Sequence, residues 1–355
     1  MSKVLKIAAG TLVGVVLLWM SLPGEEDRAK VLEGIRAASW PLLLASILIG
    51  IVAHNLLRAW RWRLMLSPEK PGIGFYNLFS TILIGYAISF ALPMRLGEVL
   101  RPMLLAERER IRPTVALTTV ALERVMDGLA VLTLFGVSLL IWDGRARLGP
   151  EGQQIFAGFR LGAMIMIAAG VAAGVLGLGA LATRDRWEPR LQAFADRTRS
   201  RAAAAIARAV IGFIDGAEVL RRPGLLLASA LLSLAIWLVI GCSTWVGLDG
   251  CGIRLGFHEV FILLPASVLG IGIPSPGGVG SFEFFVSQTL HHILGQPLAT
   301  SYAATLILHV AVTLVPVILT GLVFLWKDGV SVERMREALA LAGASAAPAG
   351  EGSAS

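Results

Sequence analysis

The sequence is poor in charged residues and in cysteine. Only 15% of its 355 residues are Asp, Glu, Lys or Arg, whereas a soluble domain carries about a quarter. The two cysteines, Cys242 and Cys251, are too few for a disulfide framework, and Cys242 falls in an apolar run, where a structural thiol is expected. The composition therefore argues against a soluble domain and against a disulfide-stabilised scaffold.

Several motifs of catalysis and of nucleic-acid binding are also missing. The sequence has no P-loop, no His-Glu-x-x-His, no Asp-x-Asp sugar-nucleotide motif and no Gly-x-Ser-x-Gly elbow. It has neither zinc-finger spacing nor an RNA-binding aromatic motif. The adjacent His291 and His292 project about 100° apart on a helix and so rarely share one metal ion. We therefore expect no enzyme activity, no cofactor, no metal and no nucleic-acid partner.

Long apolar runs are abundant. Hydrophobic residues make up 56% of the chain and the mean hydropathy is +0.75. Several runs reach the roughly 18 to 20 residues that cross about 30 Å of hydrocarbon. The expected fold is an all-α polytopic membrane protein, and the net charge of +7 is assigned to basic loops beside anionic headgroups. The apolar runs cover about 4–22, 40–57, 74–92, 114–142, 160–182, 224–247, 257–294 and 299–326.

Two segments are interrupted by helix breakers and charges. Residues 74–106 continue into PMRLGEVLRPMLLAE, and residues 257–294 contain PSPGGVGSFE. Non-helical backbone at membrane depth must be buried in protein or line a water-filled cavity. We therefore predict about six full transmembrane helices plus two opposed re-entrant or broken helical hairpins. One hairpin, at about 75–107, enters from the cytoplasmic face, and the other, at about 258–294, enters from the outer face.

The basic residues set the orientation. With the N-terminus inside and both hairpins returning to their own side, 21 of the 31 Lys and Arg residues lie inside, 7 outside and 3 within the membrane. This split obeys the positive-inside rule and predicts a multi-pass cell-membrane protein with both termini in the cytoplasm. Because no small-x-small cleavage site follows the first run, we interpret that run as a retained span rather than a signal peptide. Residues 1–330 are expected to form the transmembrane domain, with a partly helical cytoplasmic loop at 183–222, and residues 331–355 a disordered cytoplasmic tail.

Charged residues inside the predicted membrane region are costly and by default mark function. The alternative is that they form internal salt bridges that hold the hairpins in the bundle. A further segment, LLRAWRWRLML, interleaves Arg58, Arg61 and Arg63 with two tryptophans at the cytoplasmic end of the second run, where a cytoplasmic loop at 58–73 is expected. These arginines are expected to act as an interfacial anchor or as a phosphate contact. The intramembrane charges, many of them three or four residues apart as on one helix face, are Arg95, Glu98, Arg101, Glu123, Arg124, Asp127 and Glu283.

The segment PSPGGVGSFE is expected to let a half-helix begin inside the bilayer. The free N–H groups and the positive dipole end of such a half-helix point at an anion, and glycines let a headgroup approach the backbone closely. The sequence leaves three roles open for its carboxylate: pairing with a substrate amine, pairing with Arg95 or Arg101, or accepting a coupling proton. The residues assigned to this part of the site are Pro276, Gly277, Gly278, Gly280 and Glu283.

Four segments in this order carry a family resemblance: Arg-Trp after the second run, LPMRLGEVLRPMLL, ERVMD and PSPGGVGSFE. Over about residues 5–326 the chain resembles the lysylphosphatidylglycerol synthase transmembrane region, a flippase-like family. In multiple peptide resistance proteins this module moves aminoacylated phosphatidylglycerol between leaflets, and a soluble acyltransferase-like domain follows it. The resemblance implies that this chain, which ends about 25 residues after its last apolar run, lacks the synthase.

The function expected from these features is movement of a polar or anionic lipid between leaflets. The candidate lipids are aminoacylated phosphatidylglycerol, polyprenyl-phosphate-linked sugars, hopanoid-type lipids and ordinary phospholipids, and the protein is a possible homo-oligomer. The alternatives are a membrane-embedded enzyme and a non-transporting scaffold or regulator of lipid or envelope synthesis.

Overall fold

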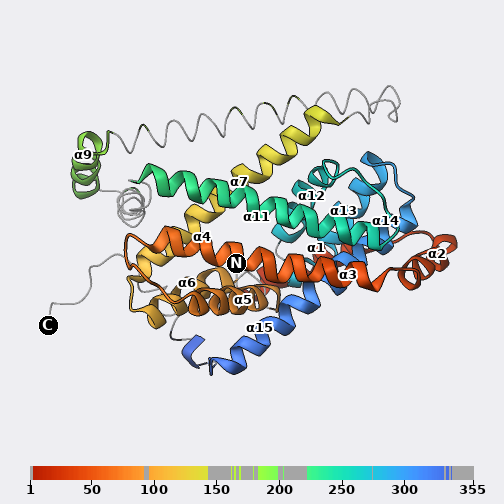
Figure 1. The fold of residues 1–355 in the computed structure, drawn as a ribbon, viewed down its shortest axis with the longest axis horizontal. Helices are drawn as coiled ribbons and strands as arrows, with labels where there is room; N and C mark the ends of the chain where they lie inside the picture. The colour runs from red at the N-terminus through yellow and green to blue at the C-terminus, as the bar shows by residue number, and fades with distance from the viewer. Residues whose placement is uncertain are drawn as a thin grey trace.

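The computed structural model describes residues 3–91, 96–142, 183–198, 222–273, 275–331, 333–335 and 337, with isolated residues between 161 and 203. Every regular element in these ranges is helical (Figure 1), which confirms the all-α prediction for this part of the chain. The predicted run at 160–182 and most of the predicted tail after 331 lie outside the described residues.

Four helices are long and apolar enough to cross a membrane. The first is continuous through α3 (Trp40–Ile47), the π-helical η1 (Leu48–Ala53) and α4 (His54–Leu66). The last is continuous through α14 (Leu298–Leu306), the π-helical η7 (Ile307–Leu314) and α15 (Val315–Lys327). The other two are α7 (Pro113–Ile141) and α11 (Pro223–Gly250), and each of the four coincides with a predicted run.

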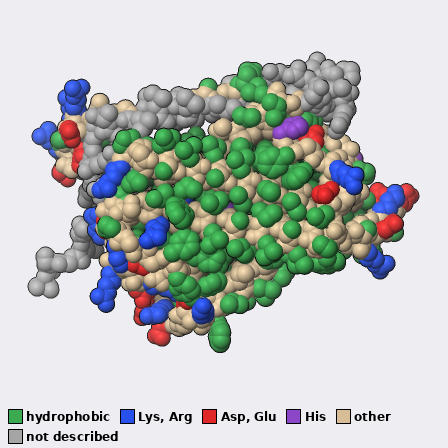
Figure 2. Space-filling view, viewed as in Figure 1, with side chains coloured by type: hydrophobic (Ala, Val, Ile, Leu, Met, Phe, Trp, Pro, Cys, Tyr) green, Lys and Arg blue, Asp and Glu red, His purple; other side chains and the backbone are tan. Residues whose placement is uncertain are grey.

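The shorter helices complete the assembly. The N-terminal run folds as α1 (Lys3–Ser21), which is followed by the short, charged α2 (Glu25–Arg36). The predicted partly helical loop contains α9 (Arg184–Arg197). In Figure 1, α2 lies at one end of the long axis and α9 at the other. Apolar side chains cover the middle of the face shown in Figure 2, and charged side chains gather toward its two ends, the pattern that a lipid belt requires.

The first interrupted segment folds as two helices packed side by side, α5 (Phe75–Ala91) and α6 (Leu96–Glu109). Glycine permits this packing, because a Cβ added to Gly97 would lie 1.8 Å from the carbonyl oxygen of Gly85. At about 1.5 Å per residue, neither arm reaches the roughly 30 Å of a hydrocarbon core. The turn between them, which includes Arg95, lies outside the described residues.

The second interrupted segment also folds as two packed arms. Its first arm is α12 (Val260–Gly272), and its second is α13 (Ser281–Gln288), extended by the π-helical η6 (Thr289–Ile293). A single 3-10 turn, η5 (Pro276–Gly278), forms the tip between them. The paired arms agree with two helical hairpins, while their entry and exit on one side of the membrane stays a prediction.

The tip of the second hairpin reaches the end of α5. A Cβ added to Gly277 would lie 3.5 Å from the carbonyl oxygen of Phe90 and 3.1 Å from Leu314 on η7. In Figure 1 the α5–α6 pair and the α12–α13 pair lie toward opposite ends of the molecule. The entry of the two hairpins from opposite membrane faces stays a prediction.

The structure corrects the predicted location of two arginines. Arg58 and Arg61 were assigned to a cytoplasmic loop, but α4 continues to Leu66 and buries both side chains, which are 3% and 0% exposed. The helix continues past them because carboxylates on α7 compensate their charge. Without these two residues, the predicted split of basic residues is about 19 inside to 7 outside, which keeps the same orientation.

We expect a single cysteine in place of Arg197 to resist a membrane-impermeant thiol reagent in intact cells and to react after permeabilisation. The background would carry alanine at Cys242 and Cys251. A cysteine in place of Arg28, on α2 at the other end of the molecule, is the matched control and should react in intact cells. The reverse labelling pattern would contradict the orientation.

Candidate functional site

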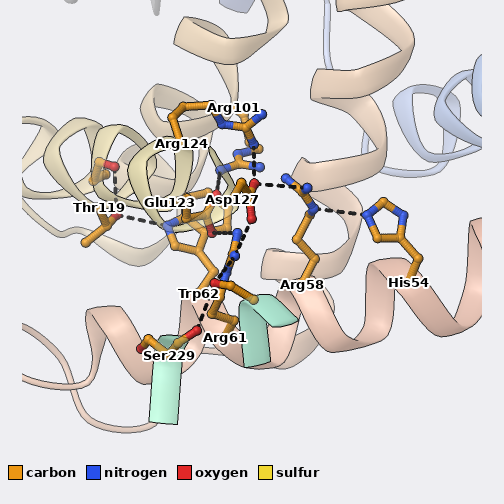
Figure 3. A network of polar contacts seen from close by, with 12 residues as sticks. His54, Arg58, Arg61, Trp62, Arg101, Thr119, Glu123, Arg124, Asp127 and Ser229 are labelled. Atoms are coloured by element: carbon orange, nitrogen blue, oxygen red, sulfur yellow. Dashed lines mark hydrogen bonds and ion pairs between the residues drawn. The ribbon is translucent and has the colours of Figure 1, made fainter. Parts of the chain in front are cut away.

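Four arginines and two carboxylates from three helices meet inside the bundle (Figure 3). We call this set the arginine cluster. Its members come from α4, α6 and α7: Arg58, Arg61, Arg101, Glu123, Arg124 and Asp127.

Helix geometry explains why each element contributes more than one member. Arg58 and Arg61 are three residues apart on α4, and Glu123 and Asp127 are four apart on α7, so each pair occupies neighbouring positions on one helix face. Glu123 lies ten residues into α7, about 15 Å along the axis at 1.5 Å per residue. The carboxylates of the cluster therefore lie within the length of the candidate membrane span α7 rather than at its end.

Asp127 holds three of the arginines. Its Oδ1 accepts a hydrogen bond from Arg61 Nη1 at 2.5 Å, and its Oδ2 accepts one from Arg58 Nη2 at 3.2 Å. Arg124 Nη2 forms a longer ion pair with the same Oδ2 at 3.5 Å. Asp127, Arg58 and Arg61 are 4%, 3% and 0% exposed, so the two hydrogen bonds between them are poorly screened by solvent.

Glu123 holds the fourth arginine. Its Oε2 accepts a hydrogen bond from Arg101 Nη2 at 2.5 Å, and its Oε1 lies 3.7 Å from Arg61 Nη2. The Arg101 guanidinium also lies over the ring of Trp62, 4.4 Å from its centroid, in a cation–π contact. Trp62 is fixed in turn, because its Nε1 donates to Thr119 Oγ1 at 3.0 Å.

Neutral groups orient the two arginines on α4. Arg61 Nη1 donates to Ser233 Oγ of α11 at 2.6 Å. Arg58 Nε donates to His54 Nε2 at 3.1 Å, so His54 carries its proton on Nδ1 and donates it to the Gly50 carbonyl oxygen. His54 is thus a neutral acceptor that adds no charge to the cluster.

The cluster has an excess of positive charge. Four guanidinium groups face two carboxylates, and the half-buried Glu98 on α6 adds one further negative charge that acts on Arg124. One positive charge is therefore in excess even when Glu98 is counted. Among the described side chains, five guanidinium nitrogens of the cluster are buried without a hydrogen-bond acceptor: Arg58 Nη1, Arg61 Nε, Arg61 Nη2, Arg101 Nε and Arg124 Nε.

The glycine-rich segment forms a half-helix as the sequence predicts. Gly277, Gly278 and Gly280 have φ values of 64°, 76° and 88°, and α13 begins at Ser281 immediately after them. The anion at this helix N-terminus is a side chain of the protein, because Glu283 Oε2 accepts a hydrogen bond from the Gly280 N–H at 2.7 Å. The other carboxylate oxygen lies 2.6 Å from His309 Nδ1.

The predicted site residues thus divide into two groups. The arginine cluster contains Arg61, Arg101, Glu123, Arg124 and Asp127, with Glu98 beside it on α6. Pro276, the three glycines and Glu283 lie at the hairpin tip. Among the described residues, Glu283 pairs with His309, whereas the carboxylate partner of Arg101 is Glu123.

Sequence reasoning missed His309, and it left Arg58 out of the site residues although it offered the arginines of this segment as a possible phosphate contact. His309 lies in the interior of the last apolar span, and the rule that intramembrane ionisable residues mark function applies to it equally. Arg58 could have been grouped with Arg61 by their spacing of three on one helix.

Gly280→Ala is expected to destabilise the protein by at least about 1–3 kcal/mol, the cost of holding a residue with a side chain in the left-handed region. The added Cβ would also lie 1.8 Å from the carbonyl oxygen of Gly14 on α1, so α1 would have to move. Thermal unfolding of the purified protein measures the loss. Gly272→Ala is the control, because no atom other than those of the adjoining chain lies within 4 Å of its added Cβ. Equal melting of the two variants would contradict the argument.

Comparisons with known proteins agree with this architecture. The profile of a family described as "Lysylphosphatidylglycerol synthase TM region" matches residues 7–320. The chain is also similar to a protein named glycosyltransferase AglD from Haloferax volcanii, with 27% identity over 325 residues. That alignment covers 83% of this chain and 49% of the relative, so the chain spans about half the length of that protein. No solved structure matches the chain significantly.

Proposed function

Since the chain belongs to the lysylphosphatidylglycerol synthase transmembrane-region family, we propose that it moves a lipid with an anionic headgroup between the leaflets of the cell membrane. The observation that carries the proposal is the arginine cluster, in which buried guanidinium groups outnumber the carboxylates. An excess charge at membrane depth is costly, and a bound anion would compensate it.

A phosphate group has the chemistry that the cluster requires. Arginine presents planar, forked donors that match phosphate oxygens in pairs. A bound phosphate would supply acceptors to some of the unpaired nitrogens of the cluster, and a buried donor without an acceptor costs about 1–3 kcal/mol. Arg124 has 38% of its side chain exposed, so it is the member best placed to meet a ligand first.

The hairpins support transport over simple binding. Opposed broken helices that place non-helical backbone near the middle of the bilayer resemble transporters in which two halves alternate around a central site. We propose transport rather than catalysis, because the cluster consists of arginines paired with carboxylates rather than a nucleophile beside a base. The glycosyltransferase name belongs to the relative, of which this chain covers about half.

A scaffold or regulator of lipid synthesis is the second candidate. One observation favours it: the arginine cluster joins α4, α6 and α7, and Arg61 extends it to α11, so the same bonds could serve only to hold the bundle together. A purely structural cluster would bind no lipid phosphate and would move no lipid.

Reconstitution of the purified full chain in vesicles separates these functions. Phosphatidylglycerol with a fluorescent label on an acyl chain would be placed in both leaflets, and an impermeant quencher would report its movement to the outer leaflet. We expect labelled phosphatidylglycerol to move faster in vesicles with protein than in empty vesicles, and faster than a matched phosphatidylcholine. Equal rates with and without protein would contradict transport, and native mass spectrometry of the purified protein would show which lipids it retains.

A further inference from the structure

The His309 imidazole contacts the second hairpin at two places, the 3-10 turn η5 and the first turn of α13. His309, in the π-helical η7, lies with Nε2 3.0 Å from the carbonyl oxygen of Gly277 and with Nδ1 2.6 Å from Glu283 Oε1. The two residues that it contacts flank the turn from which α13 begins. His309 is 0% exposed and Glu283 is 1% exposed, and the Phe282 ring stacks on the imidazole at 4.4 Å.

The donors and acceptors at this contact fix a proton count. A carbonyl oxygen only accepts hydrogen bonds, so His309 Nε2 must carry a hydrogen to bond Gly277. The contact between Nδ1 and the Glu283 oxygen then needs one further proton, either on the imidazole or on the carboxyl group. Without that proton, a nitrogen lone pair and an anionic oxygen would face each other at 2.6 Å.

We propose that Glu283 and His309 together form a proton-binding site that latches the hairpin tip to the last membrane span. Both hydrogen bonds of His309 form when the pair holds the shared proton. After its release, the remaining hydrogen of the imidazole sits either on Nε2 or on Nδ1, so one of the two bonds is lost. His309 then holds the hairpin by one of these two contacts instead of both.

The helices packed against the tip place few other titratable side chains near Glu283 and His309. α12 from Val260 to Gly272 and α1 from Gly10 to Ser21 contain no titratable side chain. On α14 the Tyr302 phenol is within electrostatic reach of Glu283. Other titratable groups lie on described elements that pack against α13, η5 and η7, and the hydrogen bonds of His309 and Glu283 described here involve none of them. They include Tyr86, Cys242, Asp249, His291, His292 and Lys327.

The tip also touches the helix that borders the arginine cluster. α5 places the carbonyl oxygen of Phe90 beside Gly277, and one turn earlier its Tyr86 ring lies 5.4 Å from the Arg58 guanidinium carbon. Movement of the tip would therefore change the contacts of α5, which also touches the arginine cluster. This link to lipid movement rests on the proposed function, whereas the proton-dependent latch does not.

Hydrogen–deuterium exchange of the purified full chain tests the latch directly. After correction for the intrinsic pH dependence of exchange, amides of residues 277–283 in the wild type should exchange about tenfold faster at pH 10 than at pH 5. This fold-change corresponds to about 1.4 kcal/mol. Glu283→Gln should abolish the change, because its amide donates to His309 Nδ1 and its oxygen accepts from the Gly280 N–H without a titratable proton.

His292→Gln is the matched control, since it removes an exposed imidazole from the same hairpin and should keep the wild-type profile. A wild type without pH-dependent exchange, or a Glu283→Gln variant that keeps it, would overturn the latch. A second arm measures movement of labelled phosphatidylglycerol in vesicles between pH 5 and pH 10. Movement that is independent of pH in the wild type would overturn coupling, while absence of movement with a working latch would count against the proposed function alone.

Discussion

Arg124→Gln is expected to weaken phosphatidylglycerol binding and movement about tenfold to a hundredfold while leaving the fold nearly unchanged. A hydrogen bond to a charged group contributes about 1.5–3 kcal/mol, which corresponds to this range of affinity. The pair of Arg124 with Asp127 is long, at 3.5 Å, and its arginine is partly exposed. Losing such a pair costs only about 0–1 kcal/mol of stability.

Lipid retained in native mass spectra and lipid movement in vesicles would measure the functional loss, and thermal unfolding would measure the structural one. Arg63→Gln is the control for removal of one positive charge, because Arg63 lies on α4 next to Trp62 but is exposed and outside the cluster. If Arg124→Gln and Arg63→Gln bind and move phosphatidylglycerol equally well, the arginine cluster is not the headgroup site.

Asp127→Asn is expected to have the largest effect on stability, a loss of about 3–5 kcal/mol. Removing one partner of a buried ion pair leaves an uncompensated charge in a poorly solvated place. Asp127 pairs with Arg58, Arg61 and Arg124, so its neutralisation leaves all three without their shared carboxylate. The yield of folded protein and its melting temperature should fall together.

A second substitution distinguishes charge balance from loss of a hydrogen-bond acceptor. Adding Arg124→Gln to Asp127→Asn removes one excess positive charge and should restore part of the lost stability. Asp249→Asn is the control, since Asp249 forms a more exposed pair with Arg254 at 3.8 Å and its loss should be nearly neutral. An Asp127→Asn variant within about 1 kcal/mol of the wild type would show that the buried charges are compensated in another way.

The membrane-spanning helices could be predicted because lipid imposes one requirement on every segment that crosses it. An apolar run long enough to span must satisfy its backbone internally as a helix, and the four longest described helices coincide with predicted runs. The end of the second span could not be predicted in this way. Arg58 and Arg61 marked it as a loop, and only their carboxylate partners on α7 allow α4 to continue as a buried helix.

The half-helix at PSPGGVGSFE could also be predicted from the sequence. Positive φ values fall on Gly277, Gly278 and Gly280, where glycine alone avoids strain. The group that occupies the N-terminus of the half-helix could not be predicted from the sequence. The sequence predicted an external anion at this N-terminus. In the structure the Glu283 carboxylate, three residues after Gly280 in the first turn of α13, accepts a hydrogen bond from the Gly280 N–H.

The sequence by itself determined that the protein is helical, lies in a membrane, breaks two of its apolar segments and carries charges where lipid disfavours them. These properties follow from composition and from local spacing, which act within one segment. Only the tertiary structure decided the partners of those charges: Glu123 with Arg101, Asp127 with Arg58 and Arg61, and Glu283 with His309. The physical reason is that each of these pairs joins residues from different helices, and helix packing, which no local pattern encodes, brings them within hydrogen-bond distance.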